Sequence, residues 1–141
     1  RRWRGGRPVW CARRSTAIKA LNPAIKVIGV EPEGSPTLKA SLDAGHVVRL
    51  AEVTSRVATM SCRQTDGRIF ETVRTKVDDV LLVSDDDMLQ ASRWLWSEFA
   101  IAADLSGAAS IAALRRWGPR FDSFGKVCAL ICGAGSEGVG R

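Results

Sequence analysis

The chain has 141 residues, 45% of them hydrophobic, which is enough for one compact globular domain. No run of about 18 apolar residues occurs and no apolar leader is present, so a membrane-spanning helix and a secretory signal are not predicted. The net charge of +6 resides in residues 1–14, which hold six arginines and no acid, whereas the remainder has 15 Lys+Arg and 15 Asp+Glu. The basicity therefore belongs to a leader and not to the domain.

Two interpretations fit the basic leader, residues 1–14. Arginines interleaved with Trp3 and Trp10 are typical of segments that contact nucleic-acid phosphates and stack on bases. A disordered or non-native leader has the same composition, and we favour it. Nucleic acid is therefore not the expected partner, and residues 15–141 are expected to form the domain.

The first elements follow from apolar periodicity and from helix-stop residues. Residues 12–21 fit a helix that ends before Pro23, and residues 27–30 form an apolar run typical of a strand buried on both faces. Ser35 has the place of a helix N-cap before a proline, and Gly45 has the place of the matching C-terminal stop.

The helical period returns at Ile69, and residues 80–83 predict a second apolar strand. Ser84 and Asp87 then have the spacing of a capping box, in which each side chain hydrogen-bonds to the other residue's backbone N–H. The helix that they start carries its apolar residues on one face, namely Met88, Ala91, Leu95 and Phe99.

The last third predicts one more helix, from Ser106 to a break at Gly118, and a third strand over residues 127–132. Strands separated by helices predict an α/β fold with mostly parallel strands. Ligands in such folds lie beyond the carboxyl ends of the strands. The turns at residues 31–36 and 133–138 therefore become the candidate binding loops.

The four cysteines have no zinc-site spacing. On the predicted third strand, Cys128 and Cys132 would be about 13 Å apart, well beyond the reach of a disulfide. We expect reduced thiols and a cytoplasmic protein.

Four segments, read in order, resemble the rear part of the threonine/serine dehydratases: AIKALNPAIKVIGVEPEGSPTLKASLDAG, FETVRTKVDDVLLVSDDDM, LSGAASIAAL and KVCALICGAG. These enzymes share the pyridoxal-phosphate fold type II with tryptophan synthase β chains and serine racemase. The resemblance covers residues 15–138. It implies a partial three-layer α/β sandwich and a dehydratase (ammonia-lyase) acting on threonine, serine or a related β-hydroxy amino acid.

The resemblance implies three cofactor-binding positions, Cys132, Gly133 and Thr59. Cys132 falls where the family has a serine or cysteine that hydrogen-bonds to the pyridine nitrogen. A neutral thiol does not hold a proton there as a carboxylate would, and the weaker electron sink suits loss of water. Thr59 replaces a glycine in the run of residues 55–60 that approaches the ring. The alternative for Cys132 is a small buried core cysteine.

The resemblance also implies a divalent-cation site for Mg²⁺ or Ca²⁺, with Glu31, Ser35 and Thr37 as oxygen ligands. Many metal-binding members have an acidic residue in place of Thr37. The alternative is an ordinary acid in a turn beside a helix N-terminus. Asp104 falls at a family glutamate, either as support for the site or as a solvated acid.

No residue is assigned a catalytic role, because no lysine falls at the position of the family's Schiff-base lysine. The phosphate-binding glycine loop is expected near residues 5–9, where the chain reads GGRPV. A GC-rich glycine run read one base out of phase yields mainly Arg, Trp, Ala and Gly, so residues 1–14 fit an out-of-frame reading of that loop.

We therefore expect part of an enzyme that is inactive alone, with a small amino acid as substrate and a homo-oligomeric state in the full-length family. Racemases and other lyases share the resemblance. Two alternatives belong to other classes: a non-catalytic regulatory or interaction module that keeps the scaffold, and a nucleic-acid-binding protein that works through its arginine leader.

Overall fold

The computed structural model describes residues 8–139, in two compact units whose boundary lies between Leu81 and Leu82. Part of the predicted leader, residues 1–7, lies outside the described residues. The rest of the leader, residues 8–14, forms the start of helix α1. None of the described helices is long and apolar enough to cross a membrane.

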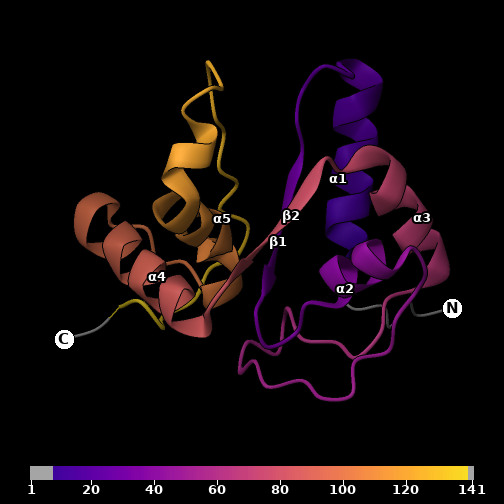
Figure 1. Cartoon of the computed structure of the whole chain (residues 1–141). Helices are drawn as coiled ribbons and strands as arrows, with labels where there is room; N and C mark the ends of the chain where they lie inside the picture. Colours follow the sequence, from indigo (N-terminus) through magenta and orange to yellow (C-terminus); the bar gives the residue numbers. More distant parts are fainter. Residues whose placement is uncertain (1–7, 140–141) are drawn as a thin grey trace, which may run out of the picture. The chain divides into compact units, whose positions relative to one another are not determined.

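The first unit contains the sheet. Along the chain it has α1 (Pro8–Leu21), β1 (Ile28–Pro32), α2 (Thr37–Ala44), α3 (Gly67–Lys76) and β2 (Asp79–Val83), whose last two residues belong to the second unit. In Figure 1 the two strands lie side by side, and they form a two-stranded parallel sheet with α2 and α3 in the connection between them. This confirms the predicted α/β class and both of the strands predicted before residue 84.

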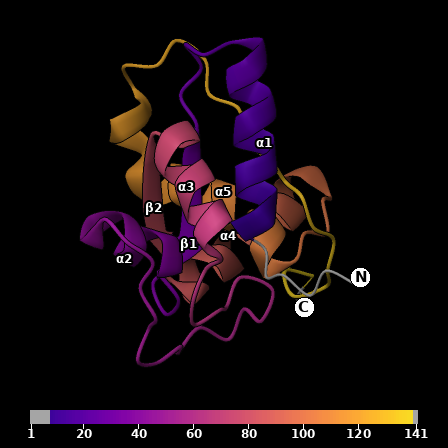
Figure 2. The same cartoon turned by 90° about the vertical axis from the view of Figure 1, so that its right-hand side faces the viewer.

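Helices α1 and α3 pack together along one side of this unit, as Figure 2 shows. Ala12, Leu38 and Val73 form a buried cluster, and their exposed fractions are 7%, 4% and 0%. Partly buried residues pack against this cluster, namely Leu42, Ile69 and Val77. One apolar face of each helix is thus buried, which is the main source of its stability.

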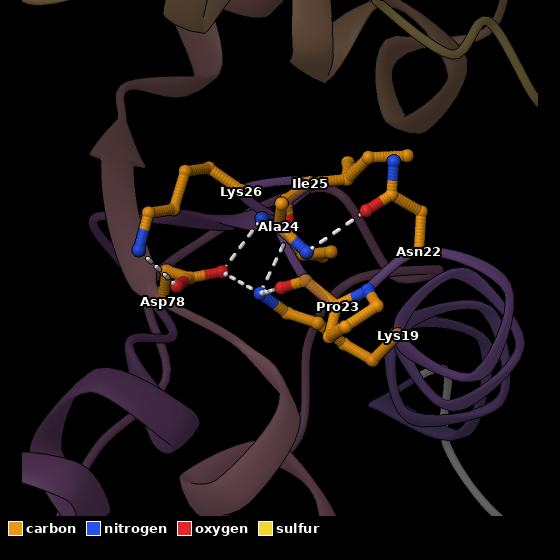
Figure 3. A network of polar contacts seen from close by, with 8 residues as sticks. Lys19, Asn22, Pro23, Ala24, Ile25, Lys26 and Asp78 are labelled. Carbon is orange, nitrogen blue, oxygen red and sulfur yellow. Dashed lines mark hydrogen bonds and ion pairs between the residues drawn. The ribbon is translucent and has the colours of Figure 1, made fainter.

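A single carboxylate, Asp78, joins three elements of the first unit (Figure 3). It accepts hydrogen bonds from the Lys19 amine at 2.7 Å, the Lys26 amine at 3.0 Å and the Val27 N–H at 2.8 Å. The Lys19 amine also donates to the Ile25 carbonyl at 2.7 Å. Burial acts to raise the pKa of Asp78, but these donors outweigh it and hold the pKa well below its ordinary value. The network fixes the end of α1 to the segments that lead into β1 and β2.

The second unit contains α4 (Asp85–Phe99), α5 (Leu105–Trp117) and a short 3₁₀ turn (Gly118–Phe121). The predicted capping box is confirmed, because Ser84 Oγ accepts from the Asp87 N–H at 3.0 Å and Asp87 accepts from the Ser84 N–H at 2.9 Å. Helices α4 and α5 pack against each other, and both contribute buried side chains, among them Met88, Ala91, Leu95, Ala108 and Ala112.

Three sequence-based expectations are wrong. Residues 127–132 form no strand, because no described segment pairs with them as a neighbouring strand. Ser35 does not cap α2, since Pro36 occupies the cap position and makes no side-chain capping bond. Phe99 is 57% exposed, because α4 ends beside it in the left-handed residue Ala100 and the ring packs only edge-on against Trp94.

Candidate cofactor site

The glycine turn of the second unit, residues 133–135, is fixed to the segment before α5. The Asp104 N–H donates to the Gly133 carbonyl at 3.3 Å, and the Gly135 N–H donates to the Ala102 carbonyl at 3.1 Å. Between them, Ala103 and Ala134 form an isolated antiparallel bridge. The turn therefore has one defined backbone conformation, although the residues before it form no strand.

Asp104 lies between this turn and the first turn of α5. Its carboxylate is the helix N-cap, accepting from the Gly107 N–H and, at 2.8 Å, from the Ser106 hydroxyl. A Cβ added to Gly133 would overlap the same carboxylate, and one added to Gly107 would overlap the Gly133 carbonyl. Both glycines are thus required by close approach, and Asp104 is engaged by the turn and by the helix together.

Cys132 immediately precedes the glycine turn and is exposed. It is not the buried core cysteine that was the alternative interpretation. Cys128, four residues earlier, is exposed as well. The second unit thus brings together the Cys132 thiol, the Gly133 turn and the Asp104 carboxylate.

The predicted metal ligands come together at the start of α2 in the first unit. The Glu31 carboxylate accepts from the Leu38 N–H at 2.9 Å and from the Lys39 N–H at 2.9 Å. Glu31 therefore performs the capping role that the sequence suggested for Ser35. It lies seven residues before its partner Leu38.

The two hydroxyls of the predicted metal site bind a neighbouring backbone segment. Ser35 Oγ donates to the Cys62 carbonyl and accepts from the Cys62 N–H, both at 3.0 Å. Thr37 Oγ1 contacts the Cys62 carbonyl and sulfur, both at 3.2 Å. Among the described residues, no cluster of three acidic, histidine or cysteine side chains could hold a metal ion. One carboxylate with two engaged hydroxyls is a poor fit to a hard divalent cation, and the metal site stays a prediction.

Burial dominates the electrostatics around Glu31. It raises the Glu31 pKa to about 7, against the lowering effect of the two backbone N–H donors. Burial also raises the pKa of the Cys11 thiol to about 11, and the nearby charge of Glu31 adds to this shift. The Glu31 side chain is buried and the Cys11 side chain is partly buried, so contact with solvent is limited at both groups.

Thr59, the third predicted cofactor residue, is half-buried in a loop of the first unit. The loop is held to the turn after β1, since the Thr54 N–H donates to the Gly34 carbonyl at 2.9 Å. A Cβ on Gly34 would lie 2.9 Å or less from Ser55 backbone atoms, so glycine is needed there. Sequence reasoning missed Gly34, for which the only signal was a glycine between Glu33 and Ser35 in a predicted binding turn.

Comparisons with known proteins show the family of this chain. A family model described as pyridoxal-phosphate dependent enzyme matches residues 15–133. The biosynthetic L-threonine dehydratase of Bacillus subtilis is 33% identical, over 89% of this chain and 29% of that protein. The phenylserine dehydratase of Ralstonia pickettii is 34% identical, over 87% of this chain and 38% of that protein.

Among solved structures, the T.th. threonine deaminase superposes with a TM-score of 0.77 and 34% identity, over 82% of this chain and 42% of that one. The chain thus spans about a third of the length of the curated relatives that it matches. The family match ends at Gly133, in the turn that Asp104 holds. The chain belongs to the family of pyridoxal-phosphate dependent enzymes.

Proposed function

We propose that this chain supplies one wall of a pyridoxal-phosphate site in a dehydratase (ammonia-lyase) of β-hydroxy amino acids. The observation that carries the proposal is the exposed Cys132 thiol at the start of a glycine turn that Asp104 fixes. Relatives of this chain are a threonine dehydratase and a phenylserine dehydratase, whose names give the substrate class.

The residues of this wall fit the cofactor. Cys132 offers a thiol as hydrogen-bonding partner for the pyridine nitrogen, and the residue is exposed. Gly133 is the further proposed contact in the second unit, and the role of Thr59, in the first unit, stays a prediction. When bound, pyridoxal phosphate withdraws electrons from the Cα of an amino acid, which assists the loss of a β-hydroxyl group. The role of Asp104 is to hold the turn so that the thiol keeps its direction.

The chain's five lysines do not supply the covalent link to the cofactor that the chemistry requires. The amines of Lys19, Lys26 and Lys39 are held in ion pairs at 2.5–3.0 Å. Lys76 and Lys126 lie exposed on the surface. We therefore propose that catalysis needs a lysine other than these five, from a complementing chain or from a full-length parent protein. Homo-oligomer formation and a cytoplasmic location belong to the same proposal, and the four free thiols support a reducing compartment.

The test measures 2-oxo acid formation from L-threonine, L-serine and phenylserine with added pyridoxal phosphate. The chain alone is expected to show no turnover. Turnover is expected after mixing with the part of the Bacillus subtilis dehydratase that precedes its matched segment, where the family resemblance places the Schiff-base lysine. Turnover by the chain alone would disprove the need for a further lysine. Chiral analysis of the remaining amino acid separates a racemase from a lyase.

Variants of the mixed enzyme test the thiol. Cys132→Ser is expected to retain activity, whereas Cys132→Asp places a carboxylate near the pyridine nitrogen and shifts the bound cofactor's absorption spectrum. Cys128→Ser is the matched control, because Cys128 is also exposed but precedes the turn by four residues. Equal spectra for Cys132→Asp and Cys128→Ser would remove the assignment of Cys132.

A further inference from the structure

Ser92, in the middle of α4, is a polar side chain that binds outside its own helix. It is completely buried, and its hydroxyl donates to the Ala103 carbonyl at 2.6 Å. A serine inside a helix commonly donates instead to the carbonyl four residues earlier in the same helix. Ser92 therefore ties α4 to the segment that precedes α5.

That segment is the one that holds the glycine turn, residues 133–135. The residues on either side of Ala103 make the two backbone hydrogen bonds to the turn described above, and Ala103 itself pairs with Ala134. Ala103 is 1% exposed, and its carbonyl is the group that Ser92 binds. Residues 102–104 are thus bound to α4 on one side and to the turn on the other. Any displacement of these residues would displace the turn as well.

The chain that follows the turn, residues 136–139, returns to the same place on α4 and is here called the tail loop. The Val139 N–H donates to the Ser136 carbonyl at 3.0 Å, which closes a backbone turn. Gly138 is buried within it. A Cβ added to Gly138 would lie 2.5 Å from the Ser92 carbonyl carbon and 2.6 Å from the Ser92 carbonyl oxygen. The tail loop therefore packs on α4 at Ser92 only because residue 138 is glycine.

We propose that Ser92 and Gly138 are positioning residues of the candidate cofactor site. Ser92 fixes the segment to which the turn is bound, and Gly138 lets the tail loop pack on α4 behind the turn. Asp104 acts on the turn from α5, so the direction of Cys132 depends on both helices of the second unit. The effect on the cofactor rests on the proposed function, whereas the fixing of the turn rests on these contacts alone.

The first experiment measures native-state hydrogen exchange of individual amides in the full chain by NMR. Ser92→Ala leaves the buried Ala103 carbonyl without its donor. The Gly135 N–H is expected to exchange about tenfold faster relative to the amides of α5, because local opening of the turn becomes easier. Ser97→Ala is the matched control, since the exposed Ser97 hydroxyl donates within α4, to the Trp94 carbonyl at 3.2 Å.

Gly138→Ala is the second variant, because its methyl group would overlap the Ser92 backbone and displace the tail loop. The same relative increase in exchange is expected. Gly125→Ala is its control, since no atom lies within 4 Å of the added Cβ. In a second experiment, each variant is mixed with the same part of the Bacillus subtilis dehydratase, and pyridoxal phosphate is titrated by absorbance. Ser92→Ala and Gly138→Ala are expected to raise the dissociation constant about threefold or more, since the competent position of the turn is less populated.

Three results would overturn the proposal: exchange of the Gly135 N–H as slow in Ser92→Ala as in Ser97→Ala, equal acceleration of all slowly exchanging amides, or a looser turn with unchanged affinity for pyridoxal phosphate. The second result would show only a general loss of stability. If the mixed parent chain binds no pyridoxal phosphate, the proposed function fails. The exchange rates then still decide whether Ser92 and Gly138 fix the turn.

Discussion

Asp104 illustrates how one side chain connects the candidate site to its scaffold. The carboxylate caps α5 through the Gly107 N–H, and its own N–H binds the Gly133 carbonyl. There is no room between it and the turn for any side chain on Gly133. The position of Cys132 therefore depends on glycine next to it as much as on Asp104.

Gly133→Ala should consequently disrupt the turn. The new methyl group would overlap the Asp104 carboxylate, and we expect a loss of about 1–3 kcal/mol in the free energy of unfolding. Urea denaturation provides the measurement. Gly118→Ala is the matched control, because no atom lies within 4 Å of its added Cβ and its backbone is right-handed helical. If both variants lose the same stability, the close approach to Asp104 is not the cause.

A second residue-scale prediction concerns Glu31. Its two oxygens accept the Leu38 and Lys39 N–H groups at the start of α2, where no other side chain caps the helix. Glu31→Ala should destabilise the chain by about 1–3 kcal/mol, since buried N–H donors lose their partners. Glu31→Gln keeps one acceptor oxygen and should lose less. Thermal unfolding of the three proteins compares them, and an alanine variant as stable as the glutamine variant would refute the capping role.

At the scale of elements, the sequence predicts features formed by residues close together in the chain. It does not predict the contacts between distant segments. The Ser84–Asp87 capping box was predicted because both partners lie within one turn of the chain. The cap of α2 was assigned to Ser35, because the true cap, Glu31, acts from the end of β1. Residues 127–132 have the composition of a strand, but a strand requires a neighbour, and composition does not reveal whether one is present.

The same difference between neighbouring and distant residues applies to the candidate site. Cys132 and Gly133 were predicted through the resemblance of residues 126–135 to a known family. Gly34 was missed, because its need for glycine arises from the approach of Ser55, a residue 21 positions away in the chain. The sequence allows two roles for Asp104, support of the site or an ordinary solvated acid, because the contact that decides between them joins Asp104 to Gly133.

The Asp78 network, at the junction of α1, β1 and β2, leads to a prediction about how the stability of the chain depends on pH. The folded pKa of Asp78 lies below the ordinary value of 3.8, so the unfolded chain binds more protons near and below that value. The stabilisation is complete above about pH 5 and is lost as the pH falls through 3.8 and below. Asp78→Asn should be less stable at pH 7 and should lose less stability between about pH 5 and about pH 3. Equal pH profiles for the variant and the parent chain would contradict this assignment.

At the scale of the whole molecule, the rates at which the four thiols are alkylated test the exposure of cysteines in both units. Cys128 and Cys132 are exposed, whereas Cys62 is only partly exposed and burial raises the pKa of Cys11 to about 11. Because the thiolate is the reacting form, a rise from 9.0 to about 11 lowers the reactivity of Cys11 at pH 8 by about a hundredfold, before any effect of access.

Alkylation at pH 8 should therefore label Cys128 and Cys132 first, and all four thiols should react rapidly in urea. Mass spectrometry of the digested chain identifies the order of labelling. Rapid labelling of Cys11 in the folded chain would refute its burial.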